Sequence, residues 1–163
     1  MKKIYINEPA CIGCHLCEVY CQVAHSRSKD LVKAFKRESP EPLPSLWVEE
    51  RKPVCFPVQC RHCADPVCVY ACLTGALWRD PDSGIVSVDM DKCIGCWTCI
   101  LACPFGAIRQ ETDQGKIVKC DLCEGRDVPV CVTNCPNEAL VYAEAQDDTV
   151  NDATVNHLVQ KRR

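Results

Sequence analysis

The chain of 163 residues carries a formal net charge of −3, 17 cysteines and only 6% aromatic residues. Aromatic packing therefore cannot supply the core, and so high a cysteine content demands a covalent or metal framework. The acidic balance argues against nucleic acid as a partner. No apolar run approaches the ~18 residues that span a bilayer, and the first residues lack the apolar stretch of a signal peptide, so we expect a cytoplasmic protein without a direct membrane span.

The first of four cysteine quartets opens the chain with the spacing C-x2-C-x2-C-x3-C, which is typical of bacterial iron–sulfur proteins. Its members are Cys11, Cys14, Cys17 and Cys21. A cubane cluster needs four converging thiolates, and one tight loop can supply three of them. The C-x3-C step predicts that the last cysteine lies on the first turn of a following helix and faces a neighbouring cluster. Each quartet therefore implies a partner quartet.

Residues 28–54 interrupt this pattern, and we interpret them as a connecting arm. They begin with a charged segment over residues 29–37 that predicts a helix, continue through three prolines, and end in a strand-like segment over residues 46–50. The seventeenth thiol, Cys55, follows outside any quartet, and we expect it to be buried and inert.

Three further quartets follow, and together the four quartets contain 16 of the 17 cysteines. They comprise Cys60, Cys63, Cys68 and Cys72; then Cys93, Cys96, Cys99 and Cys103; then Cys120, Cys123, Cys131 and Cys135. A matching pentapeptide follows each of them, at residues 73–77, 104–108 and 136–140, and marks an exit from helix into strand. The β-branched segments 85–88 and 116–119, each after a turn-forming stretch, predict two further strands.

The last residues, 146–163, contain no cysteine, and we expect a solvated tail. Its apolar positions Val155, Leu158 and Val159 have helical spacing, so a short helix that docks on a partner is the alternative.

Disulfide bonds and structural zinc sites are the two alternatives to iron–sulfur clusters as an explanation of the cysteine content. Disulfides would require an oxidising compartment, and an odd cysteine count would leave one thiol over. Zinc sites usually pair two C-x2-C knuckles and do not use a regular C-x3-C step. Four [4Fe–4S] clusters with their thiolates would bring the net charge to about −11.

Several other residues lie close to the cysteine loops. His15 and His62 lie inside them, and we expect packing or hydrogen bonding near a cluster sulfur rather than metal ligation. Trp97 either shields its cluster from water or packs in the core. A group of carboxylates flanks a predicted turn, which explains them without catalysis. These are Asp80, Asp82, Asp89 and Asp91.

Three segments resemble a known family. They are residues 56–68 (FPVQCRHCADPVC), 93–108 (CIGCWTCILACPFGAI) and 119–123 (KCDLC). The chain resembles the four-cluster, ferredoxin-like electron-transfer subunits of molybdenum or tungsten oxidoreductases, formate dehydrogenases, hydrogenases and nickel carbon monoxide dehydrogenases. Among these it is most similar to the short forms, the carbon monoxide dehydrogenase partner and the small subunit of tungsten aldehyde oxidoreductase.

The resemblance implies an α+β fold of two bacterial-ferredoxin-like modules, loop-rich with short strands and helices, each binding two clusters. One module would combine residues 1–27 with 115–145, the other would cover 55–114, and residues 28–54 and 146–163 would be arm and tail.

The spacing alone allows either adjacent or nested pairing of the quartets, and the resemblance implies nested pairing, first with fourth and second with third. The four ligand sets would be Cys11, Cys14, Cys17 and Cys135; Cys120, Cys123, Cys131 and Cys21; Cys60, Cys63, Cys68 and Cys103; and Cys93, Cys96, Cys99 and Cys72.

The resemblance further implies an electron-transfer subunit that performs no catalysis of its own. It would relay single electrons through four [4Fe–4S] clusters between a catalytic subunit and a second redox partner, such as a flavin subunit or a ferredoxin. The catalytic subunit would be of the tungsten or molybdenum, carbon monoxide dehydrogenase or hydrogenase type. A freely diffusing polyferredoxin is the alternative, and self-association into a longer wire is an extension. We expect contact surfaces around the terminal clusters, with apolar area from residues 46–50 and from the stripe at 155–159.

Overall fold

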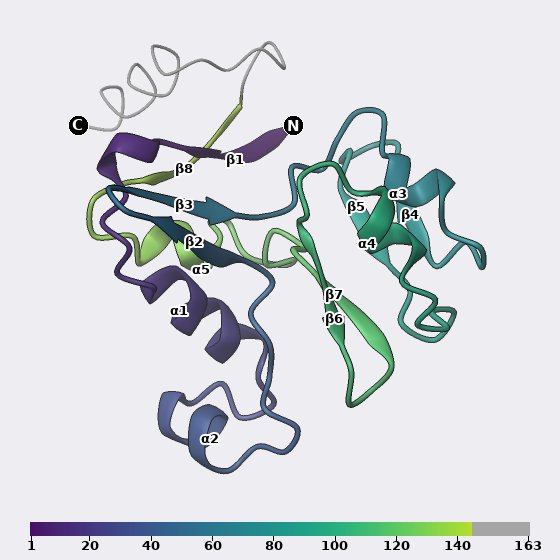
Figure 1. The fold of residues 1–163 in the computed structure, drawn as a ribbon, viewed down its shortest axis with the longest axis horizontal. Coiled ribbons are helices and arrows are strands. Elements are labelled where there is room, and N and C mark those ends of the chain that lie inside the picture. Colours follow the sequence, from purple (N-terminus) through teal and green to yellow (C-terminus); the bar gives the residue numbers. More distant parts are fainter. Residues whose placement is uncertain (145–163) are drawn as a thin grey trace.

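The computed structural model describes residues 1–144, which form short helices and two-stranded sheets joined by long cysteine-bearing loops (Figure 1). This is the small, loop-rich mixture of helix and strand that was predicted. The predicted tail, with its apolar stripe at 155–159, lies outside the described residues. None of the helices in residues 1–144 has the length and apolar character needed to cross a membrane.

The two ends of the described chain lie side by side in one sheet. Strand β1 (Lys2–Ile6) pairs antiparallel with β8 (Leu140–Glu144), and a short 3-10 turn, η1 (Glu8–Ala10), follows β1. Helix α1 (Leu16–His25) packs against α5 (Val130–Thr133) on the same side of the molecule (Figure 1). The first and last cysteine quartets are thereby brought together, although they are far apart in the sequence.

The arm contains one helix and one strand. Helix α2 (Leu31–Lys36) lies within the predicted segment, and the Asp30 carboxylate caps it by accepting a hydrogen bond from the Lys33 N–H at 2.9 Å. Strand β2 (Trp47–Arg51) pairs with β3 (Val54–Val58). Leu46 precedes β2 and is only 2% exposed, so the predicted contribution of this residue to a docking surface is wrong. Its side chain belongs to the same buried cluster as Ile4 and Leu140 and is therefore not available to a partner.

The second half of the chain forms two hairpins. Strand β4 (Leu77–Arg79) pairs with β5 (Val86–Val88), and β6 (Ile108–Glu111) pairs with β7 (Lys116–Lys119), as the two β-branched segments predicted. Helix α3 (Val67–Tyr70) packs against α4 (Thr98–Ala102) beside the first hairpin (Figure 1).

The three pentapeptides end where strands begin. Their last residues, Leu77, Ile108 and Leu140, are the first residues of β4, β6 and β8, and all three are buried. The predicted exit from helix into strand is therefore confirmed.

Buried side chains form two separate core clusters. The first lies around β1, β8 and α1 and includes Ile4, Leu46 and Leu140; the second lies around β4 and β6 and includes Leu77, Val86 and Ile108. Ile117 of β7 belongs to the second cluster, and β7 pairs with β6. The predicted boundary between residues 114 and 115 thus falls inside a hairpin.

The helices start earlier than the C-x3-C spacing predicted. Cys17, not Cys21, lies in the first turn of α1, and Cys103 follows the last residue of α4. The prediction that the fourth cysteine opens a helix is therefore wrong. Each of these helices begins one residue before the third cysteine, and about one turn then carries the chain to the fourth.

Candidate iron–sulfur sites

The structure gathers the 16 quartet cysteines into four groups, which we name sites I to IV. Site I comprises Cys11, Cys14, Cys17 and Cys135; site II comprises Cys21, Cys120, Cys123 and Cys131; site III comprises Cys60, Cys63, Cys68 and Cys103; site IV comprises Cys72, Cys93, Cys96 and Cys99. The cysteines of sites I, III and IV each line a cavity of their own. Every cysteine of the chain is a free thiol.

Site II is the most enclosed of the four, since all of its cysteines are buried. Burial raises the pKa of the Cys131 thiol most, and the next contributions come from neighbouring sulfurs. These neighbours are, in order, Cys120, Cys21 and Cys123 of site II and then Cys17 of site I. The four thiols of site II therefore lie close to one another.

Three sites draw three cysteines from one loop and the fourth from the partner quartet. Cys135 joins the loop of the first quartet, Cys103 joins that of the second, and Cys72 joins that of the third. This placement is the nested arrangement that the resemblance implied. Binding of iron by these cysteines stays a prediction.

The cysteine loops share a left-handed backbone turn. Gly13 and Gly95 have φ angles of 65° and 66°, and His62 and Leu122 stand at the equivalent position of their loops with φ angles of 45° and 58°. Left-handed residues next to right-handed ones form a concave backbone whose N–H groups converge on an anion. Only glycine adopts this conformation without steric cost. His62 and Leu122 adopt it with a side chain, so the surrounding structure must offset the cost in their loops.

Backbone N–H groups also point at cysteine sulfurs. The fourth cysteine of three quartets accepts such a hydrogen bond from the following pentapeptide: Cys72 from Leu77 at 3.5 Å, Cys103 from Ala107 at 3.4 Å, and Cys135 from Ala139 at 3.2 Å. Cys21 accepts one from the Ser45 N–H at 3.3 Å. These donors stabilise a negatively charged sulfur, which is the form that binds iron.

Burial opposes that charge as long as no metal is bound. It raises the pKa of the Cys17 thiol to about 12 and that of Cys99 to about 11. A cluster iron would replace the proton of each buried thiol, so these groups suit metal ligation better than free thiolate chemistry. Free sulfurs in groups of four, with backbone donors aimed at them, fit [4Fe–4S] clusters, and the count of four is consistent with 16 cysteines.

The two loop histidines differ from each other. His62 is 1% exposed, and its Nδ1 accepts a hydrogen bond from the Val86 N–H at 3.0 Å. Burial lowers the pKa of His62 to about 3, so the ring is neutral and its proton lies on Nε2, which has no partner within residues 1–144. His15 instead lies 3.0 Å from a Glu18 oxygen and 2.6 Å from a Glu50 oxygen, so its nearest polar partners are carboxylates rather than sulfur.

The remaining residues close to the loops can also be placed. Trp97 both lines the site IV cavity and packs against the second core cluster. Asp80 accepts hydrogen bonds from Asp82 N–H and the Ser83 hydroxyl, which fits the predicted turn. Cys55 lies in β3 and is half-buried, so it is less buried than was predicted, and its inertness stays a prediction.

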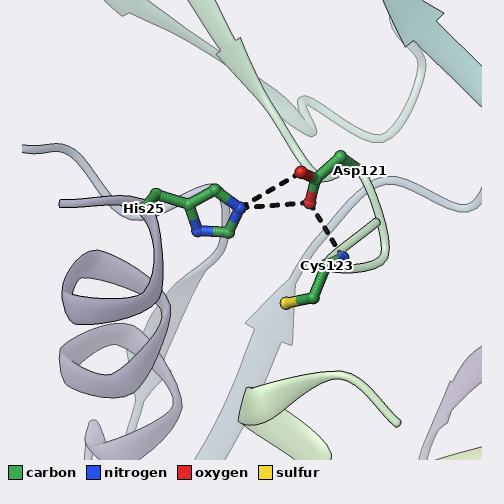
Figure 2. Close-up of side chains that lie close together, drawn as sticks. All are labelled: His25, Asp121 and Cys123. Atoms are coloured by element: carbon green, nitrogen blue, oxygen red, sulfur yellow. Dashed lines mark hydrogen bonds and ion pairs between the residues drawn. The ribbon is translucent and has the colours of Figure 1, made fainter. Parts of the chain in front are cut away.

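A charged pair next to site II did not emerge from the sequence analysis. Figure 2 shows His25, at the end of α1, with its Nε2 directed at the Asp121 carboxylate, 3.1 and 3.3 Å from the two oxygens. Asp121 Oδ1 also accepts a hydrogen bond from the Cys123 N–H at 2.9 Å. The hydrogen bonds to Asp121 and Cys21 raise the pKa of His25 to about 11. Burial alone would raise the pKa of Asp121, but the hydrogen bond and charge of His25 lower it to about 2.

The same side chains could in principle hold a separate metal ion. One ligand atom each of His25, Asp121 and Cys123 lies within 4.8 Å of the others. Such an ion would compete for the Cys123 sulfur with site II, where Cys123 faces three further cysteines. The spacing of Cys21 and His25, four residues apart on one helix, was the sequence signal for the contact between these two residues, but not for the contact with Asp121.

Several curated iron–sulfur and electron-transport proteins are similar to this chain. The chain is 36% identical to an iron-sulfur protein of Rhodospirillum rubrum over 98% of this chain and 92% of the relative. It is 36% identical to the electron transport protein HydN of Escherichia coli over 86% of this chain and 87% of HydN. A sulfite dehydrogenase subunit of Allochromatium vinosum is 32% identical over 98% of this chain and 74% of the relative.

A family model described as a 4Fe-4S dicluster domain matches residues 52–145, which is more than half of the chain. The matched segment contains the second, third and fourth quartets. The chain therefore belongs to the 4Fe-4S dicluster family of ferredoxin-like iron–sulfur proteins.

Proposed function

We propose that this chain is an electron-transfer subunit that relays single electrons through four [4Fe–4S] clusters, bound at sites I to IV, between a catalytic subunit and a second redox partner. The observation that carries the proposal is the grouping of 16 free cysteines into four sets of four. One-electron transfer is the chemistry that such clusters would supply when bound. The protein supplies spacing, exclusion of water and hydrogen bonds to sulfur.

The order of the sites along the molecule supports a relay. Sites I and II share helix α1, which carries Cys17 and Cys21. Sites III and IV share helix α3 and the residues directly after it, which carry Cys68 and Cys72. Sites II and III lie next to each other, because burial raises the pKa of the Cys120 thiol of site II most, and the nearby Cys60 sulfur of site III raises it further. The order is therefore I, II, III, IV.

The two ends of this series are the accessible ones. Cys14 of site I and Cys96 of site IV are exposed, whereas site II is buried throughout. Ile12, 62% exposed, lines the site I cavity, and Ile94, 65% exposed, lines the site IV cavity. Exposed apolar side chains around a buried redox centre favour docking of a partner protein. Electrons would enter at one end and leave at the other.

The names of two relatives support a partner of the oxidoreductase type. HydN is described as an electron transport protein, and the relative from Allochromatium vinosum as a subunit of sulfite dehydrogenase. We infer a catalytic oxidoreductase subunit as one partner of this chain, in the cytoplasm. The two-module organisation belongs to the same proposal, with residues 1–27 and 115–145 in one module and residues 55–114 in the other.

The proposal is tested by metal content and by one ligand substitution. Anaerobically purified protein should contain about 16 iron and 16 sulfide per chain. Cys135→Ser should perturb the cluster of Cys11, Cys14 and Cys17, since Cys135 lines that cavity. The spectroscopic readout is the EPR spectrum of the reduced protein.

The matched control is Cys55→Ser, which removes the thiol outside the four sites and should leave about 16 iron. Eight or fewer iron atoms in intact wild-type protein would contradict the four-cluster relay. Damage in Cys135→Ser that is confined to the site of Cys120, Cys123 and Cys131 would contradict the nested arrangement.

A further inference from the structure

We propose that His25 is a positioning residue for site II: it fastens Cys21 to the loop of the other ligands and, through its fixed positive charge, favours the reduced state of the cluster bound there. The inference rests on the proposed function. No proton moves in this role, because the ring acts as a permanent donor and cation.

Each ring nitrogen of His25 has as its nearest partner an oxygen that only accepts hydrogen bonds. Nδ1 lies 2.8 Å from the Cys21 carbonyl oxygen and 3.6 Å from the Cys21 sulfur, and Nε2 lies 3.1 Å from Asp121 Oδ1. A carbonyl and a carboxylate cannot donate, so both nitrogens carry a proton and the ring is an imidazolium. Figure 2 shows the ring between the end of α1 and the loop of Asp121 and Cys123.

The contact joins two segments that must meet for site II to exist. Cys21 comes from α1, whereas the other three cysteines of the site come from residues 120–131. His25 lies one helical turn after Cys21, and Asp121 lies between Cys120 and Leu122, 96 residues further along the chain. The charged hydrogen bond from His25 to Asp121 therefore sets the distance between the fourth ligand and the loop.

The position of the charge decides which redox state benefits. The imidazolium Nδ1 lies 3.6 Å from the Cys21 sulfur, whereas the Asp121 carboxylate, bound by Nε2, lies within 4.8 Å of the Cys123 sulfur, so loss of the imidazolium would leave only the negative charge beside the site. Reduction adds one electron, supplied by the redox partner, to the cluster and its thiolates. A cation and a hydrogen-bond donor next to a ligand sulfur stabilise that added charge, so the potential of this cluster rises relative to a protein without them.

Two substitutions separate the two contacts. His25→Gln places an amide near the position of Nε2, so it keeps a donor toward Asp121 and loses the donor and charge beside Cys21. His25→Asn places an amide near Nδ1, so it keeps a donor toward Cys21 and loses the link to Asp121. Lys29→Gln is the matched control, because Lys29 is a cation that binds the Ala24 carbonyl at the end of the same helix without a hydrogen bond to Cys21 or Asp121.

The experiment is an anaerobic redox titration of the full-length holoprotein followed by EPR, with iron counted first. We expect His25→Gln to retain four clusters and to lower the midpoint potential of one of them, while the other three keep theirs. That cluster should be the one absent from Cys21→Ser protein. We expect His25→Asn to release the same cluster faster than wild type when a chelator is added, and Lys29→Gln to behave as wild type.

Wild-type potentials and wild-type iron retention in both His25 variants would overturn the inference. So would an equal shift in Lys29→Gln, or a loss that extends to all four clusters. If His25→Gln loses the site II cluster and retains the other three, that selective loss supports the positioning role. A wild-type protein with eight or fewer iron atoms would instead defeat the proposed function itself, so the two failures are distinguishable.

Discussion

At the scale of single residues, the lack of a Cβ atom at Gly95 allows the cysteine loop of site IV to lie against the backbone at Gly115. A Cβ on Gly95 would lie 2.2 Å from the Gly115 carbonyl oxygen, so the loop of site IV passes directly against the backbone of the β6–β7 turn. Gly75 has almost the same left-handed φ, 65°, yet nothing lies within 4 Å of its Cβ position. A comparison of the two glycines therefore separates the cost of the steric contact from the cost of a left-handed backbone conformation.

We predict that Gly95→Ala destabilises the protein more than Gly75→Ala. An alanine at positive φ costs about 1 kcal/mol at either position, and Gly95→Ala must in addition displace the backbone at Gly115. The measurement is the denaturant midpoint for loss of the visible iron–sulfur absorbance, together with the iron content. Equal midpoints for the two variants would show that the contact with Gly115 has no energetic consequence.

At the scale of elements, a repeated local unit joins each helix to its strand. After the fourth cysteine the pentapeptide turns the chain back, donates an N–H to the cysteine sulfur, and begins a strand with a buried apolar residue. In the last of these units Leu140 is 1% exposed and faces Ile6 across the sheet. The strand pairing at Leu140 and the hydrogen bond from Ala139 to the Cys135 sulfur thus depend on adjacent residues.

Leu140→Ala should destabilise the protein by about 2–5 kcal/mol, because it removes a fully buried side chain and leaves a cavity. Leu101→Ala is the matched control: Leu101 lies on α4 and is 88% exposed, so its loss should change stability by less than about 0.5 kcal/mol. The readout is the same denaturant midpoint. A control as unstable as Leu140→Ala would contradict the burial argument.

At the scale of the whole molecule, the cysteines form part of the core. Cys17, Cys21, Cys120 and Cys131 belong to the first core cluster, and Cys93 and Cys99 belong to the second. The described strands contain at most five residues each, and their sheets contain two strands each, which is marginal for independent stability. Metal ligation would therefore contribute to folding as well as to electron transfer.

Removal of iron should accordingly loosen the protein as a whole. We predict that apoprotein prepared with a chelator under reducing conditions loses most of its protection against backbone hydrogen exchange, including the pairing of β1 with β8. Reconstitution with iron and sulfide should restore this protection. An apoprotein with the exchange pattern of the holoprotein would mean that the apolar clusters alone hold the fold.

Local signals in the chain predicted most of the elements. The β-branched segments, the turn-forming stretches and the pentapeptides gave the hairpins and their starting residues, because each signal acts within a few residues. The position of the cysteines on the helices was mispredicted, since spacing alone does not show where the first helical turn begins. The burial of Leu46 was missed because the residue packs in the core next to segments remote in sequence.

The sequence by itself determined the chemistry of this protein: sixteen cysteines in four spaced quartets, an odd thiol, and too few aromatic residues for an ordinary core. Ligand type and loop spacing are local properties, and a resemblance carried by the same motifs identified the family. Only the tertiary structure decided which quartets meet, that site II is enclosed while Cys14 and Cys96 are exposed, and that His25 meets Asp121. These features depend on the pairing of β1 with β8 and on the packing of α1 against α5, contacts between segments more than 100 residues apart, which no local pattern encodes.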